Sequence, residues 1–198
     1  MANNDRLKTY HRKRDFRRTG EPRGTGRRKA AAEPRFVVQK HAATRLHYDF
    51  RLEADGVLKS WAVPKGPSTD PADKMLATAT EDHPLAYADF EGVIPEGSYG
   101  AGPVIVWDSG TYRNCTERGG RQVPIEEAIA TGHLSVWLEG RKLHGGYALT
   151  RMRSGRRDDW LLVKKRDETA DRRHDPRSAE PRSVLSGRRV EEVDATGR

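Results

Sequence analysis

Residues 45–63, RLHYDFRLEADGVLKSWAV, contain two short segments, Arg45–Glu53 and Val57–Val63, in which apolar and polar side chains alternate. Alternation with period two places successive side chains on opposite faces of a β-strand. The same pattern recurs between Gly, Pro and Asp residues at Arg35–Gln39, Met75–Thr80, Val104–Asp108, Leu134–Leu138, Gly146–Met152 and Trp160–Lys165. It predicts an all-β fold with minor α content, an antiparallel barrel or sandwich. One helix is expected at Pro124–Ala130, where Pro suits the first helical turn and Gly132 follows the last.

Positive charge is concentrated at the N-terminus of this 198-residue chain, whose net charge is +8. Residues 1–34 hold 11 basic and 4 acidic residues, whereas residues 35–166 carry +2 and residues 167–198 carry −1. We therefore expect a basic arm (1–34), a β-domain (35–166) and a flexible polar tail (167–198) with a short helix around Ser186–Val193. The arm is either a solubilising tail or a clamp on a nucleic-acid backbone, and composition does not choose between them. Its basic residues include Arg12, Lys13, Arg14, Arg17, Arg18, Arg27, Arg28 and Lys29.

Several classes of protein are disfavoured. The single cysteine, Cys115, cannot form an internal disulfide, and no apolar run approaches the ~20 residues of a membrane span. The basic N-terminus has no apolar stretch behind it, as an export signal would, so a cytoplasmic location is expected. Phosphate-loop, dinucleotide and serine-hydrolase motifs are absent. Glu53-Ala54-Asp55-Gly56 lacks the lysine nucleophile of nucleotidyl transfer, which excludes ligation.

The segment at residues 45–52 carries the chemistry. Read as a strand, it places Leu46, Tyr48, Phe50 and Leu52 on one face and Arg45, His47, Asp49 and Arg51 on the other. Neutral His and ionised Asp bind divalent cations, and Arg binds two phosphate oxygens at once, so this face predicts a metal beside a phosphate. An exposed face with an Asp–Arg pair explains the segment equally well.

A second histidine favours the metal site. His41 precedes His47 by six residues, and a turn through Ala42 and Ala43 would bring both imidazoles to one ion. Two His and one Asp without a thiolate suit a catalytic Mn²⁺ or Zn²⁺ that keeps positions open for water and substrate.

His83 is a candidate for holding a phosphate oxygen or protonating a leaving group. The strand register from Met75 would place Ala77, Ala79, Glu81 and His83 on one side, and Pro84 favours an extended backbone at His83. A partly exposed histidine at a turn is the alternative, which position alone slightly favours. Gly97–Gly102 is flexible enough to approach a ligand, but a tight loop into the Val104–Asp108 strand is the favoured interpretation.

Long stretches of the chain resemble one known family. They are FVVQKHAATRLHYDFRLEADGVLKSWAVPKGPS (36–68), EDHPLAYADFEGVIPEGSYGAG (81–102), KRDFRRTGEPRG (13–24), GYALTRM (146–152) and WLLVKKR (160–166). Together they resemble the 3′-phosphoesterase domain of bacterial ligase D over roughly Tyr10–Arg166. The resemblance implies a compact β-barrel with a crescent-shaped active-site groove, on which the arm is partly packed.

The resemblance also implies an activity. The family enzyme depends on Mn²⁺, removes a terminal ribonucleoside from a 3′ end and then removes the remaining 3′-phosphate, preparing ends for non-homologous end joining. By motif, His41, His47 and Asp49 resemble its metal ligands, and Arg51 and His83 its phosphate-holding pair. Tyr87, Lys65 and Gln39 resemble supporting residues, and Arg14, Asp15, Glu21 and Glu81 resemble positions needed chiefly for phosphomonoester hydrolysis. The implied partners are 3′ ends of primer-template DNA and separate ligase, polymerase and Ku proteins.

Two further expectations concern departures from the family. Met75 stands where members commonly carry Arg, and in the strand register above it would face the site. Either Lys74 or an arm arginine compensates, or this protein holds phosphate more weakly. The chain resembles a freestanding version, and Ser183–Glu192 resembles the linker that follows this domain in fused enzymes. Two other functions remain open: a 2′,3′-cyclic phosphodiesterase of RNA end repair and a non-catalytic accessory that binds DNA ends.

Overall fold

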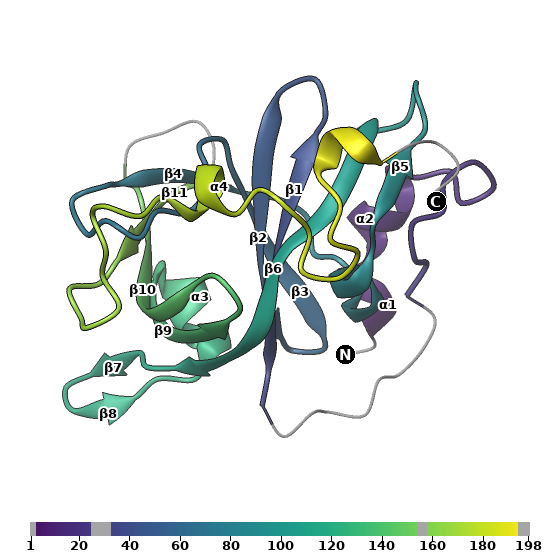
Figure 1. Cartoon of the computed structure of the whole chain (residues 1–198). Coiled ribbons are helices and arrows are strands. Elements are labelled where there is room, and N and C mark those ends of the chain that lie inside the picture. Colours follow the sequence, from purple (N-terminus) through teal and green to yellow (C-terminus); the bar gives the residue numbers. More distant parts are fainter. Residues whose placement is uncertain (1–2, 25–32, 154–157, 194–198) are drawn as a thin grey trace.

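Eight antiparallel strands close into a barrel in the computed structural model of the chain, which describes residues 3–24, 33–153 and 158–193 (Figure 1). Neighbouring strands follow the order β1, β2, β3, β4, β11, β10, β9, β6, and pairing of β6 with β1 closes the ring. The strands of the ring are β1 (Arg35–Ala42), β2 (Leu46–Ala54), β3 (Val57–Val63), β4 (Met75–Ala79), β6 (Gly102–Asn114), β9 (His133–Gly140), β10 (His144–Arg151) and β11 (Asp159–Lys164). The predicted all-β architecture with minor helix is confirmed.

Two strands extend further than alternation predicts. β1 continues through His41 to Ala42, so this histidine lies on the strand and not in the turn after it. β6 continues beyond Asp108 to Asn114 and pairs with both β1 and β9. Gly110 permits this close pairing, because a Cβ there would overlap the carbonyl oxygen of Glu139. Short strands that the sequence did not indicate are β5 (Gly92–Ile94), β7 (Glu117–Arg118) and β8 (Arg121–Gln122).

The barrel interior is filled by apolar side chains of alternating strand positions. They include Phe36, Phe50, Trp61, Trp107, Tyr112 and Trp160, which are almost completely buried. Burial of such rings is the main favourable contribution to stability, at about 25 cal/mol per Å² removed from water. The predicted helix is confirmed as α3 (Ile125–Thr131), which places Ala128 in this core and ends at Gly132, whose φ of 84° is left-handed.

Met75 belongs to this core and not to the candidate site. It is 7% exposed and packs in the same apolar cluster as Ala77. The expectation that Met75, Ala77, Glu81 and His83 share one face is therefore wrong. β4 ends at Ala79, and His83 instead forms an isolated bridge with Leu58 of β3, so the strand register does not continue to it. The Met75 departure consequently removes no basic group from the site.

The N-terminal arm covers the outer face of β1 and β3. Its helices, α1 (Asn3–Arg6) and α2 (Lys8–Arg12), lie beside the barrel (Figure 1). Leu7 and Tyr10 are buried in a second apolar cluster with Val37, Leu58 and Tyr87, the last of which belongs to the 3₁₀ helix η1 (Leu85–Asp89). Arg27, Arg28 and Lys29 of the predicted basic arm lie outside the described residues.

The C-terminal segment also packs on the barrel, which differs from the expected flexible polar tail. It crosses β6 (Figure 1) and contains α4 (Pro176–Ala179) and a 3₁₀ turn, η2 (Val190–Glu192), in place of the expected helix at Ser186–Val193. Val190 and Val193 are buried against Ile105. Isolated apolar residues in a polar stretch thus anchor the segment. Across the described ranges, no helix combines the length and apolarity needed to cross a membrane.

Candidate active site

The outer faces of β1 and β2 bring the predicted polar residues together. In the ladder between these strands, His41 is paired with His47 and Gln39 with Asp49. Tyr48 and Phe50 point into the barrel, which confirms the predicted division of β2 into a core face and a polar face, whereas Leu46 is exposed near the turn. The polar face is not open to solvent, however, because the arm and η1 cover it. Asp49 and Arg51 are only 7% and 3% exposed.

His41, His47 and Asp49 form a group that could hold a metal ion. One ligand atom from each lies within 4.8 Å of the others, and Oδ2 of Asp49 is 3.6 Å from Nδ1 of His41 and 3.7 Å from Nε2 of His47. The predicted convergence of these three donors is confirmed.

Backbone carbonyls orient both imidazoles toward this point. Nε2 of His41 lies 2.8 Å from the Gly100 oxygen, and Nδ1 of His47 lies 2.9 Å from the Arg45 oxygen. Because a carbonyl oxygen only accepts, each of these nitrogens carries the hydrogen and donates it. In the neutral form of each ring, the other nitrogen is unprotonated and faces Asp49, as a metal ligand requires.

The charges around Asp49 keep it ionised. Burial alone would raise the pKa of Asp49, but Arg51, His41 and His47 together hold the pKa well below its usual value. Burial would lower the pKa of His47, but the hydrogen bond and ion pair that its protonated ring would form with Asp49 outweigh burial, so the His47 pKa is raised. A carboxylate beside two imidazoles matches the hard and borderline ligands of Mn²⁺ and Zn²⁺.

Arg51 is fixed from three sides next to this group. Nε donates to Oε1 of Gln39 at 2.8 Å, Nη1 donates to Oγ of Ser60 at 2.8 Å, and Nη2 lies 3.3 Å from Oδ2 of Asp49. Gln39 is itself held, because its amide donates to the carbonyl oxygens of Tyr87 and Phe90. Gln39 therefore lies behind Arg51 and orients it.

His83 is buried between two guanidinium groups, so the alternative of a partly exposed turn histidine is wrong. Nδ1 lies 2.8 Å from the Glu81 carbonyl oxygen and 2.9 Å from Nη1 of Arg51, while Nε2 lies 3.2 Å from Nη2 of Arg14. A neutral ring that donates from Nδ1 to Glu81 and accepts at Nε2 from Arg14 satisfies two of these three contacts, and Arg51, which can only donate, then faces Nδ1 without a hydrogen bond to it. Burial, then Arg51 and Arg14, lower the pKa of His83 well below its usual value.

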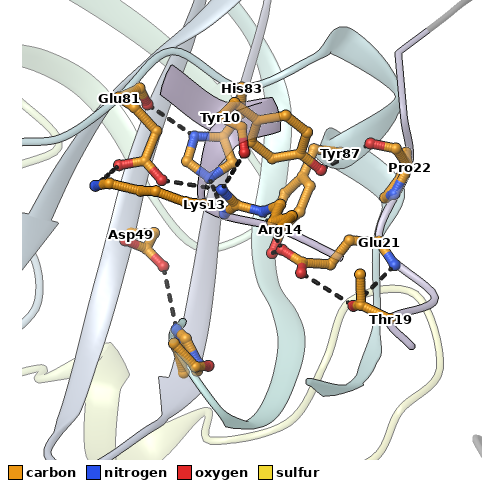
Figure 2. Close-up of polar contacts among 12 residues, drawn as sticks. Tyr10, Lys13, Arg14, Thr19, Glu21, Pro22, Asp49, Glu81, His83 and Tyr87 are labelled. Atoms are coloured by element: carbon orange, nitrogen blue, oxygen red, sulfur yellow. Dashed lines mark hydrogen bonds and ion pairs between the residues drawn. The ribbon is translucent and has the colours of Figure 1, made fainter. Parts of the chain in front are cut away.

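The arm contributes a buried network of charges (Figure 2). Figure 2 shows Arg14 between two carboxylates, with Nε 2.8 Å from Oε1 of Glu21 and Nη1 3.0 Å from Oε1 of Glu81. Lys13 donates to the other oxygen of Glu81 at 2.9 Å. The Tyr87 hydroxyl donates to Glu21 at 3.0 Å, and burial raises the pKa of Tyr87 well above its usual value, so this phenol stays protonated.

These groups surround one cavity of about 230 Å³. Its walls include His41, His47, Asp49, Arg51, His83, Tyr87, Arg14 and Glu81, all predicted from the sequence. Gln39 and Glu21 contact wall residues from behind. The structure thus supplies a pocket; the crescent-shaped groove remains an expectation.

Two predicted residues lie apart from the cavity walls. Lys65 follows β3 with its side chain exposed, and its carbonyl oxygen accepts from Arg177. Asp15 is exposed and accepts the backbone N–H of Arg17 at 3.1 Å, which fixes the turn between Arg14 and Glu21. Neither side chain is among those that line the pocket.

Some site residues were not identified from the sequence. Ser60 supports Arg51, but in the sequence it resembles any other polar residue of a strand. The ring centroid of Tyr10 lies 5.1 Å from that of His83, although Tyr10 is far from His83 in the sequence. Gly100 and Tyr99 line the cavity from the glycine-rich loop, for which a tight loop was favoured over an approach to a ligand. The signal that could have identified this loop was its single aromatic residue among glycines.

Comparisons with known proteins agree on one family. Residues 39–151 match the family model described as the DNA ligase D 3′-phosphoesterase domain. The multifunctional non-homologous end joining protein LigD of Pseudomonas aeruginosa is 52% identical over 195 residues, 95% of this chain and 22% of that protein. The corresponding DNA repair protein of Mycobacterium tuberculosis is 49% identical over 157 residues, 79% of this chain and 19% of that protein. The chain therefore spans about a fifth of the length of these curated relatives.

Proposed function

The chain belongs to the family of DNA ligase D 3′-phosphoesterase domains, and on this premise we propose that it is a metal-dependent hydrolase of nucleic-acid 3′ ends. It would remove a terminal ribonucleoside by phosphodiester hydrolysis and then the remaining 3′-phosphate by phosphomonoester hydrolysis. The relatives are named for non-homologous end joining, which makes broken DNA ends, with separate ligase, polymerase and Ku proteins, the proposed context.

One observation carries this proposal: the three converging donors His41, His47 and Asp49 share a cavity with Arg51 and His83. Donors for a cation next to a fixed guanidinium are what a phosphoryl group needs as charge builds on its oxygens. A non-catalytic protein that only binds DNA ends has no need for a buried, ionised Asp49 between two oriented imidazoles.

The donor set fits Mn²⁺. Two neutral imidazole nitrogens and one carboxylate oxygen leave several positions for water and substrate, and no thiolate is present to favour a structural zinc. When bound there, a divalent cation would polarise the phosphoryl oxygen and favour ionisation of the attacking water. We propose Mn²⁺ as the cofactor, with other divalent transition metals as substitutes.

Arg51 would hold the phosphoryl oxygens, positioned by Gln39 and Ser60. His83 is neutral in the resting protein, so its Nε2 would first accept a proton that the approaching phosphate stabilises, and could then bind or protonate an oxygen. Tyr87 would act through its ring, 5.0 Å beneath the Arg51 guanidinium, and through its hydrogen bond to Glu21.

The network of the arm would serve the second step. A phosphomonoester carries more negative charge than a phosphodiester, so its hydrolysis needs a further cation, and Arg14 supplies one at the cavity wall. Glu21 and Glu81 would hold Arg14, and Asp15 would hold the turn that connects Arg14 to Glu21. Lys65 lies outside the pocket, and a supporting role for it would concern more distant parts of the substrate.

An end-processing assay tests the proposal. Primer-templates with one, two or no terminal ribonucleotides are incubated with and without Mn²⁺, and the released nucleoside and phosphate are measured. Metal-dependent release of nucleoside followed by phosphate is the expected result. Binding without turnover would identify an accessory protein, and cleavage confined to RNA ends with a 2′,3′-cyclic phosphate would identify the cyclic phosphodiesterase; either outcome overturns the proposal.

A further inference from the structure

Tyr99 presents an exposed aromatic ring at the edge of the cavity. All Phe, Trp and Tyr residues of the chain lie in its described parts. Tyr99 is the one exposed residue among them, with 52% of its surface accessible to solvent. The others are buried or half-buried, and most of them pack in the barrel or under the arm. A ring that contributes to no core has its surface available for a ligand.

The loop that carries Tyr99 is tied to the metal site. Ser98 donates its N–H to the Pro95 oxygen, and Ala101 donates to the Ser98 oxygen, so the loop consists of two successive turns. Gly100 adopts a left-handed φ of 73° and accepts the Nε2 hydrogen of His41. The position of the ring is therefore fixed relative to a candidate metal ligand.

The arm holds the loop from the other side and places cations near the ring. Arg18 donates to the carbonyl oxygen of Glu96 at 3.3 Å. Nζ of Lys13 lies 4.2 Å from the Tyr99 ring centroid, and the guanidinium of Arg14 lies 6.0 Å from it. Lys13 also pairs with Glu81 on the cavity wall. An aromatic face beside cations is the combination that binds single-stranded nucleic acid through a base and its phosphate.

The ring also stands at a boundary. Tyr99 lines both the cavity that contains Asp49 and an adjoining surface depression of about 640 Å³ that includes Thr9, Lys13 and Thr78. A 3′ end whose phosphate lies in the cavity must leave it past such a boundary. The parts of the nucleotide next to the phosphate are its sugar and its base. Of these two, the base is the part on which an aromatic ring can stack.

We propose that Tyr99 is a stacking platform for the nucleobase next to the scissile 3′-phosphoester. This rests on the proposed function and adds to it a base-binding subsite, with Tyr99 as a substrate-binding residue. Stacking tolerates any base, because every base presents a π-face, so the subsite favours nucleotide esters over base-free phosphoesters without reading sequence.

The test compares wild type, Tyr99→Phe and Tyr99→Ala on a primer with one terminal ribonucleotide. Tyr99→Ala removes the ring on which one base would stack, so its KM should rise about tenfold, while Tyr99→Phe should keep the wild-type KM. The same primers are then made with the base missing at the terminal or at the penultimate position. The penalty should disappear on one of the two base-free primers. An unchanged KM in Tyr99→Ala, or the same penalty on both base-free primers, would overturn the proposal.

Two controls separate stacking from damage to the loop and from failure of the proposed function. Mn²⁺ affinity should be unchanged in Tyr99→Ala, since the Gly100 carbonyl that orients His41 is backbone, and Ser98→Ala should match wild type in KM. A fall in Mn²⁺ affinity would assign the effect to the metal site and overturn the inference. If wild type cleaves nothing, the proposed function fails, and quenching of 2-aminopurine next to the 3′-phosphate still decides the role of Tyr99: equal quenching in Tyr99→Ala would reject it.

Discussion

His41 and His47 face each other across the β1–β2 ladder, with ring centroids 4.8 Å apart. Their unprotonated nitrogens both point to Asp49, whose negative charge is the one that raises the pKa of His47 against the effect of burial. Metal affinity and the protonation of His47 are therefore coupled through a single carboxylate.

Replacing this carboxylate should abolish metal binding and lower the pKa of His47. Asp49→Asn removes one of three donors, so we expect Mn²⁺ affinity to fall by more than the about 10- to 100-fold typical of a lost supporting residue. Titration of Mn²⁺ by electron paramagnetic resonance measures the affinity, and NMR of the metal-free protein measures the His47 pKa. Asp82→Asn, which removes an acidic group that pairs with Lys59, is the matched control. Wild-type affinity in Asp49→Asn would refute the metal assignment.

The metal group could be predicted from the sequence for a specific physical reason. Alternation along β2 fixes which side chains share a face, and the hairpin brings His41 opposite His47, so two short-range rules suffice. Ser60 and Gln39 could be placed on strands, but only the packed barrel shows that both hold Arg51. The position of His83 depends on where β4 ends, and the polar Thr80 and Glu81 gave no sign that the register stops at Ala79.

Ser60 should affect catalysis without affecting the metal. Ser60→Ala removes the acceptor of Nη1 of Arg51 and leaves Nε held by Gln39. A hydrogen bond to a charged group is worth about 1.5–3 kcal/mol, so we expect kcat to fall about tenfold or more. Mn²⁺ affinity should stay at the wild-type value, and Ser60→Thr, which restores a hydroxyl, should recover part of the rate. A full rate in Ser60→Ala would show that Gln39 and Asp49 orient Arg51 without Ser60.

The arm could not be assigned to the site from composition. Its net positive charge is equally consistent with a solvated tail, whereas the structure buries the Arg14 and Glu21 side chains to 4% and 1% exposure. Long-range contacts of Arg14 with Glu81 and His83 depend on tertiary packing that no local pattern encodes. The packing of the C-terminal segment was equally unpredictable from local patterns, because Val190 and Val193 pack on Ile105, which is distant in the sequence.

Breaking this buried pair should loosen the arm. Glu21→Ala leaves Arg14 with Glu81 as its remaining carboxylate, and loss of one partner of a buried pair costs about 3–5 kcal/mol. We expect faster trypsin cleavage at Arg12 and Lys13, and a greater loss of phosphomonoesterase than of phosphodiesterase activity. Glu96→Gln is the control, because that side chain is exposed and the contact with Arg18 uses the backbone. Equal losses of both activities with an intact arm would contradict this division of roles.

His83 should make the metal-free protein less stable below about pH 6.5. Its folded-state pKa is lowered well below that of the unfolded chain, by burial first and then by Arg51 and Arg14. Above pH 6.5 both states are neutral at this residue, so it contributes no pH dependence. Below that pH the unfolded chain takes up a proton that the folded protein does not, so stability falls, by about 1 kcal/mol between pH 6.5 and 5.5. His47 acts in the opposite sense, because its folded-state pKa is raised and its contribution is lost as pH rises.

The difference between two proteins isolates the effect. Free energies of unfolding in urea with EDTA are measured at pH 5.5, 6.5 and 7.5 for wild type and His83→Asn. The wild-type protein should lose stability relative to His83→Asn as the pH falls, since contributions common to both cancel. The other groups around His83 do not titrate in this range, because Arg14 and Arg51 stay charged and the pKa of Glu81 is lowered by Lys13 and Arg14 despite burial. His133→Asn, at an exposed position, should follow wild type. Parallel curves for wild type and His83→Asn would show that the pKa of His83 is the same in the folded and unfolded protein. The folded ring would then take up a proton near pH 6.5 without phosphate, which would favour a direct role as an acid over one that awaits phosphate.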